Sequence, residues 1–197
     1  GLCLDGTGYG TDGAIWGGEI LVGGYRGFDR RYHLQYMPLP GGETSIHKPA
    51  RLALGYLHAL NIEWSVDLPS LKDVSEEEQA VLKAQIDHQV NTPLTSSMGR
   101  LFDAVSALIG VGQSVTYEGQ AAIELESCLD ANVSGFYTFT ISDGIIFIAD
   151  IFEQILVDMK TGLAKSAISA KFHNTIAAIM LDVSISIRNE LTCNTVA

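Results

Sequence analysis

The sequence has few cysteines, no long hydrophobic run and no recognisable leader. Three cysteines among 197 residues form neither a CxxC pair nor an even-numbered framework, so a reducing, cytoplasmic location is expected. No apolar run reaches the ~20 residues that a membrane-spanning helix needs. The first residues lack the basic region and cleavage site of a signal peptide. These absences predict a cytoplasmic protein that does not act on a membrane.

Basic residues are also scarce. The chain has 12 Lys and Arg against 23 Asp and Glu, a formal net charge of −11. Neutralising a phosphate backbone takes clustered Lys and Arg, so no nucleic-acid partner is expected, and the same charge disfavours anionic membranes. With 47% hydrophobic and 18% charged residues, the composition is that of a packed globular protein with one domain or two small lobes.

The pattern along the chain separates a strand-rich beginning from a helical remainder. Glycine-separated apolar runs predict a meandering sheet in residues 1–48, and a helical period starts at Pro49. Strands are expected at 1–5, 15–22, 30–37, 136–141 and 145–149, and helices at 76–89, 97–109, 119–129, 151–159 and 164–190. This order excludes simple βαβ alternation and predicts a mixed α/β fold, with a mainly helical part over residues 49–197 and a hairpin near 136–149.

A first candidate site follows the opening strand. The apolar run is expected to end at Asp5, and Gly6-Thr7-Gly8 follow. Because glycine has no Cβ, the backbone N–H groups of such a turn can approach an anion beside the carboxylate. No helix is expected directly afterwards, so the run does not meet the context of a dinucleotide fingerprint. An Asp-Gly hairpin turn without a ligand remains an alternative.

A second candidate site opens a helix at residues 95–103. Ser96, Ser97 and Gly99 lie at its start, where free N–H groups and the helix dipole attract phosphate. Arg100 offers a bidentate contact to an anion. The alternative is a capped helix in which Ser96 or Ser97 is the cap and Arg100 pairs with Asp103.

A third motif repeats the arrangement. Gly119 opens a helix, with Gln120 and Glu124 in its first turns, and a carboxylate there can accept hydrogen bonds from ribose hydroxyls. The alternative is a solvated glutamate that the helix dipole favours.

Five motifs in order resemble the C-terminal carbamoyltransferase part of the hydrogenase maturation factor HypF family. They are LDGTGYG at 4–10, WGGE at 16–19, PLPGGE at 38–43, SSMGRLFDAV at 96–105 and YEGQAA at 117–122. The resemblance runs from residue 1 to residue 197. It implies the two-lobe fold of the actin, hexokinase and heat-shock-chaperone (ASKHA) superfamily, incomplete in this chain, which is expected to be a piece of a longer protein truncated before the second lobe is complete.

The resemblance also implies a reaction. In this family carbamoyl phosphate and ATP give carbamoyl-adenylate, and the carbamoyl group passes to the C-terminal cysteine of the partner HypE. Dehydration there yields the cyanide ligand of [NiFe]-hydrogenase. The expected cofactors are ATP and a divalent metal, which is Mg with the nucleotide and Fe or Zn in the transferase site. Most metal ligands are expected outside this chain.

Carried onto this sequence, the resemblance implies roles for individual residues. Asp5 would be catalytic and bind the metal. The nucleotide-binding residues would be Gly6, Thr7, Gly8, Ser96, Ser97, Gly99, Arg100, Gly119, Gln120 and Glu124. The chain alone is expected to be inactive in transfer. A related O- or N-carbamoyltransferase and an inactive nucleotide-binding module remain alternatives.

Overall fold

The computed structural model describes residues 1–65 and 67–197. Its elements in chain order are β1 (Leu2–Tyr9), β2 (Ile15–Gly24), β3 (Gly27–Leu34), β4 (Met37–Pro38), α1 (Glu43–His47), α2 (Pro49–Ala59), the 3₁₀ helix η1 (Pro69–Lys72), α3 (Glu76–Asp87), β5 (Leu94–Thr95), α4 (Met98–Leu108), α5 (Gln120–Ser127), β6 (Thr140–Ser142), β7 (Ile145–Phe147), α6 (Ala149–Lys160) and α7 (Lys165–Leu191). The chain has the mixed α/β fold that the pattern predicted.

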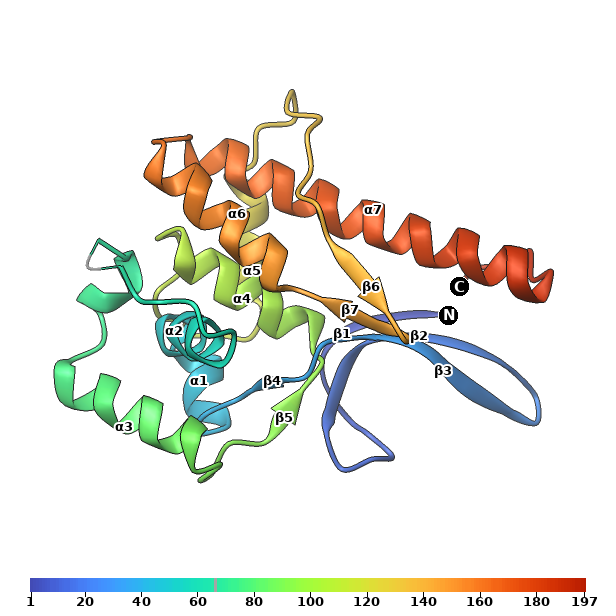
Figure 1. Cartoon of the computed structure of the whole chain (residues 1–197), viewed down its shortest axis with the longest axis horizontal. Helices are drawn as coiled ribbons and strands as arrows, with labels where there is room; N and C mark the ends of the chain where they lie inside the picture. The colour runs from blue at the N-terminus through green and yellow to red at the C-terminus, as the bar shows by residue number, and fades with distance from the viewer. Residues whose placement is uncertain (66) are drawn as a thin grey trace.

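One sheet joins the beginning of the chain to its later segments. Its strand order is β4-β5-β2-β3-β7-β6, and β1 pairs with β2 outside this path. The pairs β1–β2 and β2–β3 are antiparallel, whereas β5 joins β2 and β7 joins β3 in parallel. The helices α2, α4, α5 and α6 gather to one side of the strands in Figure 1, and the end of α7 extends beyond them.

The expectation that the first strand ends at Asp5 is wrong. β1 continues to Tyr9, and its register against β2 shifts between Leu4 and Gly8. The strand bulges there and then resumes pairing. The turn comes later, where the Gly10 N–H donates to the Ala14 carbonyl at 2.9 Å. The predicted Asp-Gly segment is therefore a bulge inside a strand.

The predicted hairpin at 136–149 is shorter than expected. Its turn has left-handed residues at Asp143 (φ 51°) and Gly144 (φ 78°), the conformation that an Asp-Gly hairpin turn requires. The preceding residues do not extend β6, because their backbone groups bond to helix side chains. The Tyr137 N–H donates to Thr175 Oγ1 at 2.8 Å, and the Thr138 N–H donates to Gln154 Oε1 at 3.0 Å.

The hydrophobic core lies among the helices and against the sheet. Fully buried side chains come from α2, α4, α6 and α7, and include Leu54, Leu57, Leu101, Leu108, Phe152, Phe172 and Ile179. α2 and α4 pack directly on each other. Within the two described ranges, no helix combines the length and apolar character needed to cross a membrane.

Candidate functional site

The bulge of β1 meets the start of α4 in a junction built from Asp5, Gly6, Ser97 and Gly99, here called the β1–α4 junction. A Cβ added to Gly99 would lie 3.2 Å from the Cα of Gly6, so the two backbones are nearly in contact. The Ser97 hydroxyl donates to the Asp5 carbonyl at 3.2 Å, although the two residues are 92 positions apart in the chain. Two of the sequence-predicted motifs are thus brought together.

Glycine on β2 makes this approach possible. A Cβ on Gly17 would lie 2.6 Å from the Asp5 carbonyl oxygen and 2.7 Å from that of Gly6, distances that real Cβ atoms essentially never show. Because Gly17 has no side chain, the bulge can rest directly on β2. The glycines of the WGGE run therefore have a packing role that the sequence alone did not specify.

Ser97 and Ser96 both make internal contacts. Ser97 is the N-cap of α4, since its Oγ accepts the Arg100 N–H at 3.1 Å, which confirms the capping interpretation. The Ser96 hydroxyl donates to the Glu19 carboxylate. Both serines are buried, so their side chains support the junction from within.

Arg100 brings a buried positive charge to the same place. It is 1% exposed, and its Nε lies 2.8 Å from Asp103 Oδ2, which confirms the pairing alternative. Nη2 lies 3.8 Å from Glu118 Oε1, and in the described part of the chain Nη1 has no hydrogen-bond partner. Burial raises the pKa of Asp103 to about 6, although the Arg100 guanidinium acts in the opposite direction. An unsatisfied buried guanidinium nitrogen has capacity to bind an anion.

The YEGQAA motif, the third one predicted, reaches the β1–α4 junction through the side chain of Glu118. The Glu118 carboxylate approaches Gly6, since a Cβ on Gly6 would lie 2.7 Å from its Oε1. Gly119 follows in a left-handed conformation (φ 82°) and begins α5. The Gln120 amide donates to Glu124 Oε1 at 2.8 Å, one turn into the helix. Sequence reasoning gave Glu118 no role, although it lies within the YEGQAA motif.

Thr7 and Gly8 complete the first predicted motif. Thr7 is exposed within the bulge, and Gly8 pairs with Trp16 where the β1–β2 ladder resumes. The structure thus gathers Asp5, Gly6, Ser97, Gly99 and Arg100 at one junction. It leaves Gln120 and Glu124 on the adjoining helix.

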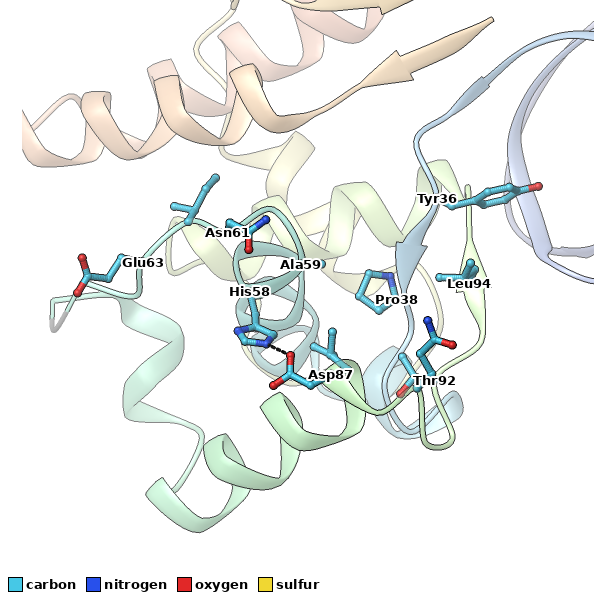
Figure 2. A pocket seen from close by; sticks show the side chains of 12 residues that line it. Tyr36, Pro38, His58, Ala59, Asn61, Glu63, Asp87, Thr92 and Leu94 are labelled. Atoms are coloured by element: carbon cyan, nitrogen blue, oxygen red, sulfur yellow. Dashed lines mark hydrogen bonds and ion pairs between the residues drawn. The ribbon is translucent and has the colours of Figure 1, made fainter. Parts of the chain in front are cut away.

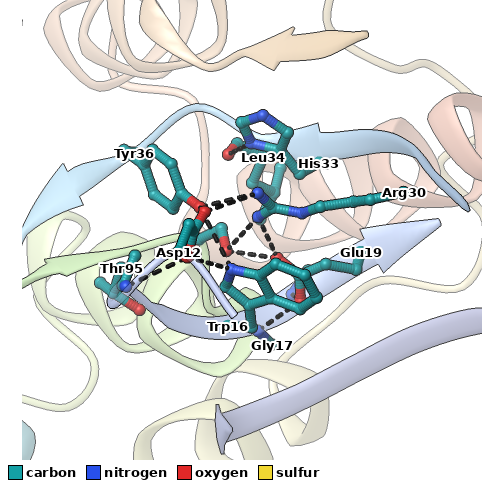
Figure 3. Close-up of polar contacts among 12 residues, drawn as sticks. Asp12, Trp16, Gly17, Glu19, Arg30, His33, Leu34, Tyr36 and Thr95 are labelled. Carbon is teal, nitrogen blue, oxygen red and sulfur yellow. Dashed lines mark hydrogen bonds and ion pairs between the residues drawn. The ribbon is translucent and has the colours of Figure 1, made fainter. Parts of the chain in front are cut away.

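Sequence reasoning also missed a polar network centred on Arg30 (Figure 3). The Arg30 guanidinium donates to Tyr36 Oη at 2.7 Å, to Glu19 Oε1 at 2.7 Å, and to Asp12 Oδ2 and Ser96 Oγ, both at 3.2 Å. Burial alone would raise the pKa of Asp12, but hydrogen bonds, from Tyr36 foremost, hold it below its usual value. The only sequence signal for this network is the glutamate of WGGE in a strand that is otherwise apolar.

A separate cavity of about 770 Å³ lies beside α2 and α3 (Figure 2). His58 Nε2 lies 2.7 Å from Asp87 Oδ1 there. None of the predicted catalytic, nucleotide-binding or metal-binding residues lines this cavity, although Pro38 of the PLPGGE motif does. It is therefore distinct from the β1–α4 junction.

The described residues do not form a metal centre. Asp5 offers an exposed carboxylate whose Oδ1 accepts the N–H of Gly6 at 2.6 Å. Within residues 1–65 and 67–197, no group of three or more His, Cys, Asp or Glu side chains is placed to hold a metal ion. Metal binding by Asp5 therefore stays a prediction.

Comparison with known proteins defines the class of this domain. All 197 residues match the family model described as "Carbamoyltransferase, Kae1-like Domain, second subdomain". A solved structure of full-length HypF in the phosphate- and nucleotide-bound form superimposes with a TM-score of 0.90 at 43% identity, covering 98% of this chain and 30% of that chain. HypF from T. kodakarensis gives a TM-score of 0.84 at 31% identity, covering 98% of this chain and 26% of that chain.

Curated relatives carry the same name. A carbamoyltransferase HypF homolog of Cupriavidus necator is 34% identical over 190 residues, covering 92% of this chain and 48% of the relative. Carbamoyltransferase HypF of Rhizobium leguminosarum bv. viciae is 37% identical over 183 residues, covering 92% of this chain and 23% of the relative. The chain belongs to the carbamoyltransferase HypF family, and it spans about half or less of the length of these relatives.

Proposed function

We propose that this chain supplies the nucleotide-facing part of a carbamoyl-transfer site. The observation that carries the proposal is the β1–α4 junction, where a helix N-terminus, a bare glycine backbone and the buried Arg100 meet. Helix N-termini and arginine side chains are both suited to phosphate. The related full-length HypF structure is a phosphate- and nucleotide-bound form, which supports the same assignment.

The proposed overall reaction is that of a HypF-type carbamoyltransferase. Carbamoyl phosphate and ATP would give carbamoyl-adenylate with release of phosphate and pyrophosphate. The carbamoyl group would then pass to the C-terminal cysteine thiol of HypE, with AMP as the leaving group. A nucleophile is then not needed from this chain, because the partner supplies the thiolate. Membership of a family whose members are named carbamoyltransferases supports this class of reaction.

In this proposal the chain's own residues bind and orient the nucleotide. Gly6, Thr7 and Gly8 of the bulge would face the phosphate, and Gly99 lets the bulge lie against the start of α4. The Arg100 guanidinium would offset the negative charge of the phosphate. Asp103 would hold Arg100 in place, since its carboxylate lies against Nε. Glu124, four residues after Gln120 on α5, would accept hydrogen bonds from the ribose.

The test is a calorimetric titration of ATP into this chain. We expect measurable binding, and we expect Glu124→Ala to weaken it about tenfold, the effect of losing one hydrogen bond to a charged group. Glu126→Ala is the matched control, because Glu126 is an exposed glutamate on the same helix. Equal affinity of both variants, or no binding by the unchanged chain, would contradict this assignment.

A second assay separates an enzyme from an inactive nucleotide-binding module. A polypeptide that joins this chain to the remaining HypF domains should release AMP and pyrophosphate from ATP only when carbamoyl phosphate is present. It should then carbamoylate a peptide ending in cysteine. Nucleotide binding without either product would favour the inactive module.

A further inference from the structure

Glu19 is a buried carboxylate in the middle of β2 that the proposed chemistry does not use. It is 2% exposed, and each of its oxygens accepts two hydrogen bonds. Oε2 takes the N–H groups of Gly17 at 2.6 Å and Gly18 at 2.9 Å. Oε1 takes Arg30 Nη2 at 2.7 Å and the hydroxyl of Ser96. One side chain therefore binds β2, β3 and the segment that leads into α4.

These contacts reach both sides of the β1–α4 junction. Gly17, whose N–H is fixed by Glu19, is the residue on which the Asp5 and Gly6 carbonyls rest. Ser96, fixed by the other oxygen, directly precedes Ser97, the cap of α4 that also donates to Asp5. A displacement of the carboxylate would therefore loosen both the part of β2 under the bulge and the segment that leads into α4.

Arg30 explains why a buried charge is tolerated at this position. It lies with its guanidinium carbon 4.1 Å from the centre of the Trp16 ring, and Asp12 and Tyr36 hold the other side of the guanidinium (Figure 3). A buried ion pair is favoured when the remaining hydrogen-bonding groups are satisfied. The Glu19 carboxylate meets that requirement, whereas within the described residues Arg30 Nε has no hydrogen-bond partner. The network is thus a rigid support rather than a solvent-facing ion pair.

We infer that Glu19 is a positioning residue that sets the spacing between the β1 bulge and the N-terminus of α4, and so the shape of the anion site. The expected effect of Glu19 on nucleotide affinity rests on the proposed function. Its structural part, the spacing of the junction, can be measured without any ligand.

The experiment is hydrogen exchange on the whole chain carrying Glu19→Gln. A glutamine amide has one acceptor oxygen and one NH2 group. Either orientation therefore points N–H groups at other donors, which are the backbone N–H groups of Gly17 and Gly18 or the guanidinium of Arg30. We expect exchange in segments 4–8 and 97–101 to rise about tenfold, with helices α6 and α7 unchanged. Glu190→Gln is the matched control, because it removes the glutamate paired with the neighbouring Arg31. It should leave both segments unchanged.

Ser96→Ala keeps the inference testable if Glu19→Gln does not fold. It deletes only the hydroxyl between Glu19 and the start of α4. Hydrogen exchange at residues 97–101 should become faster, as expected for Glu19→Gln. Uniform exchange changes over the whole chain, or none at the junction in Ser96→Ala, would overturn the inference. If the unchanged chain binds ATP, Ser96→Ala should weaken that affinity several-fold. If it does not bind, the proposed function fails while the exchange result still decides the role of Glu19.

Discussion

Asp103 is subject to two opposing influences in its buried pair with Arg100. Burial disfavours the charged carboxylate and raises its pKa to about 6, while the guanidinium favours the charged form. The effect of burial is the larger, so the ionised carboxylate is the less favourable form below about pH 6.

The pH dependence of stability tests this balance. Because the folded-state pKa lies above the ordinary value of 3.8, the folded chain binds this proton more tightly than the unfolded chain. The stabilising contribution is complete below about pH 4 and is lost as the pH rises through about 6. Relative to the unchanged chain, Asp103→Asn should gain up to about 3 kcal/mol of unfolding free energy between pH 4 and pH 7.

Urea denaturation at several pH values measures this difference. Asp182→Asn serves as the control, because Asp182 is exposed on α7. Parallel pH profiles for the unchanged chain and Asp103→Asn would show that the carboxylate titrates normally.

For individual residues, the sequence predicts contacts within one helix better than contacts between distant segments. The capping role of Ser97 and the Arg100–Asp103 pair follow from spacing along one helix, which a sequence displays directly. The contacts of Glu19 and Glu118 join segments far apart in the chain. Nothing in the local pattern specifies such partners, so both residues were left without a role.

Among the elements, the contact of β1 with β2 depends on a missing side chain. Gly17→Ala would place a methyl group 2.6 Å from the Asp5 carbonyl oxygen, so strand or bulge must move. We expect a loss of about 1–3 kcal/mol in unfolding free energy, the usual cost of overpacking. Gly24→Ala is the matched control on the same strand, because its added methyl group meets nothing within 4 Å. It should change stability by less than about 0.5 kcal/mol.

Thermal or chemical unfolding of both variants measures this contrast. Equal losses in the two variants would mean that the cost does not come from the contact of Gly17 with β1. A loss of unfolding free energy in Gly17→Ala alone would show that the cost comes from the β1–α4 junction.

The longer elements were predictable and the short ones were not. Predicted helices at 76–89, 97–109, 151–159 and 164–190 are confirmed as α3, α4, α6 and α7, because each has an apolar face and most have recognisable starts. The sequence pattern predicts no strand at residues 94–95, yet Leu94–Thr95 are β5. Two residues carry no periodicity, and their strand character comes from pairing with β2 and β4. The bulge in β1 likewise depends on its neighbours.

For the molecule as a whole, the sheet unites segments that the sequence pattern separated. β5 and β7 pair in parallel with β2 and β3, so the strand-rich beginning is completed by residues from the helical remainder. The β1–α4 junction lies where these parts meet. The contacts at the junction that the sequence predicts, the Ser97 cap and the Arg100–Asp103 pair, lie within one element. The assembly of the junction is a property of the whole sheet.

The net charge of −11 acts on the whole molecule. Like charges repel one another more in the folded chain than in the expanded one, which lowers stability. Salt screens this repulsion, since the Debye length is about 10 Å at 0.1 M. Raising NaCl from about 0.02 to about 0.2 M at pH 7.5 should raise Tm by roughly 2–4 °C, the shift that about 1 kcal/mol gives in a domain of this size.

The same titration near pH 5 is the control, because the chain is almost neutral close to its isoelectric point of about 4.7. There the salt should change Tm little. An equal rise at both pH values would indicate a general salt effect on hydrophobic burial. A fall at pH 7.5 would mean that screening of ion pairs such as Arg31–Glu190 and Lys48–Glu78 outweighs relief of the repulsion.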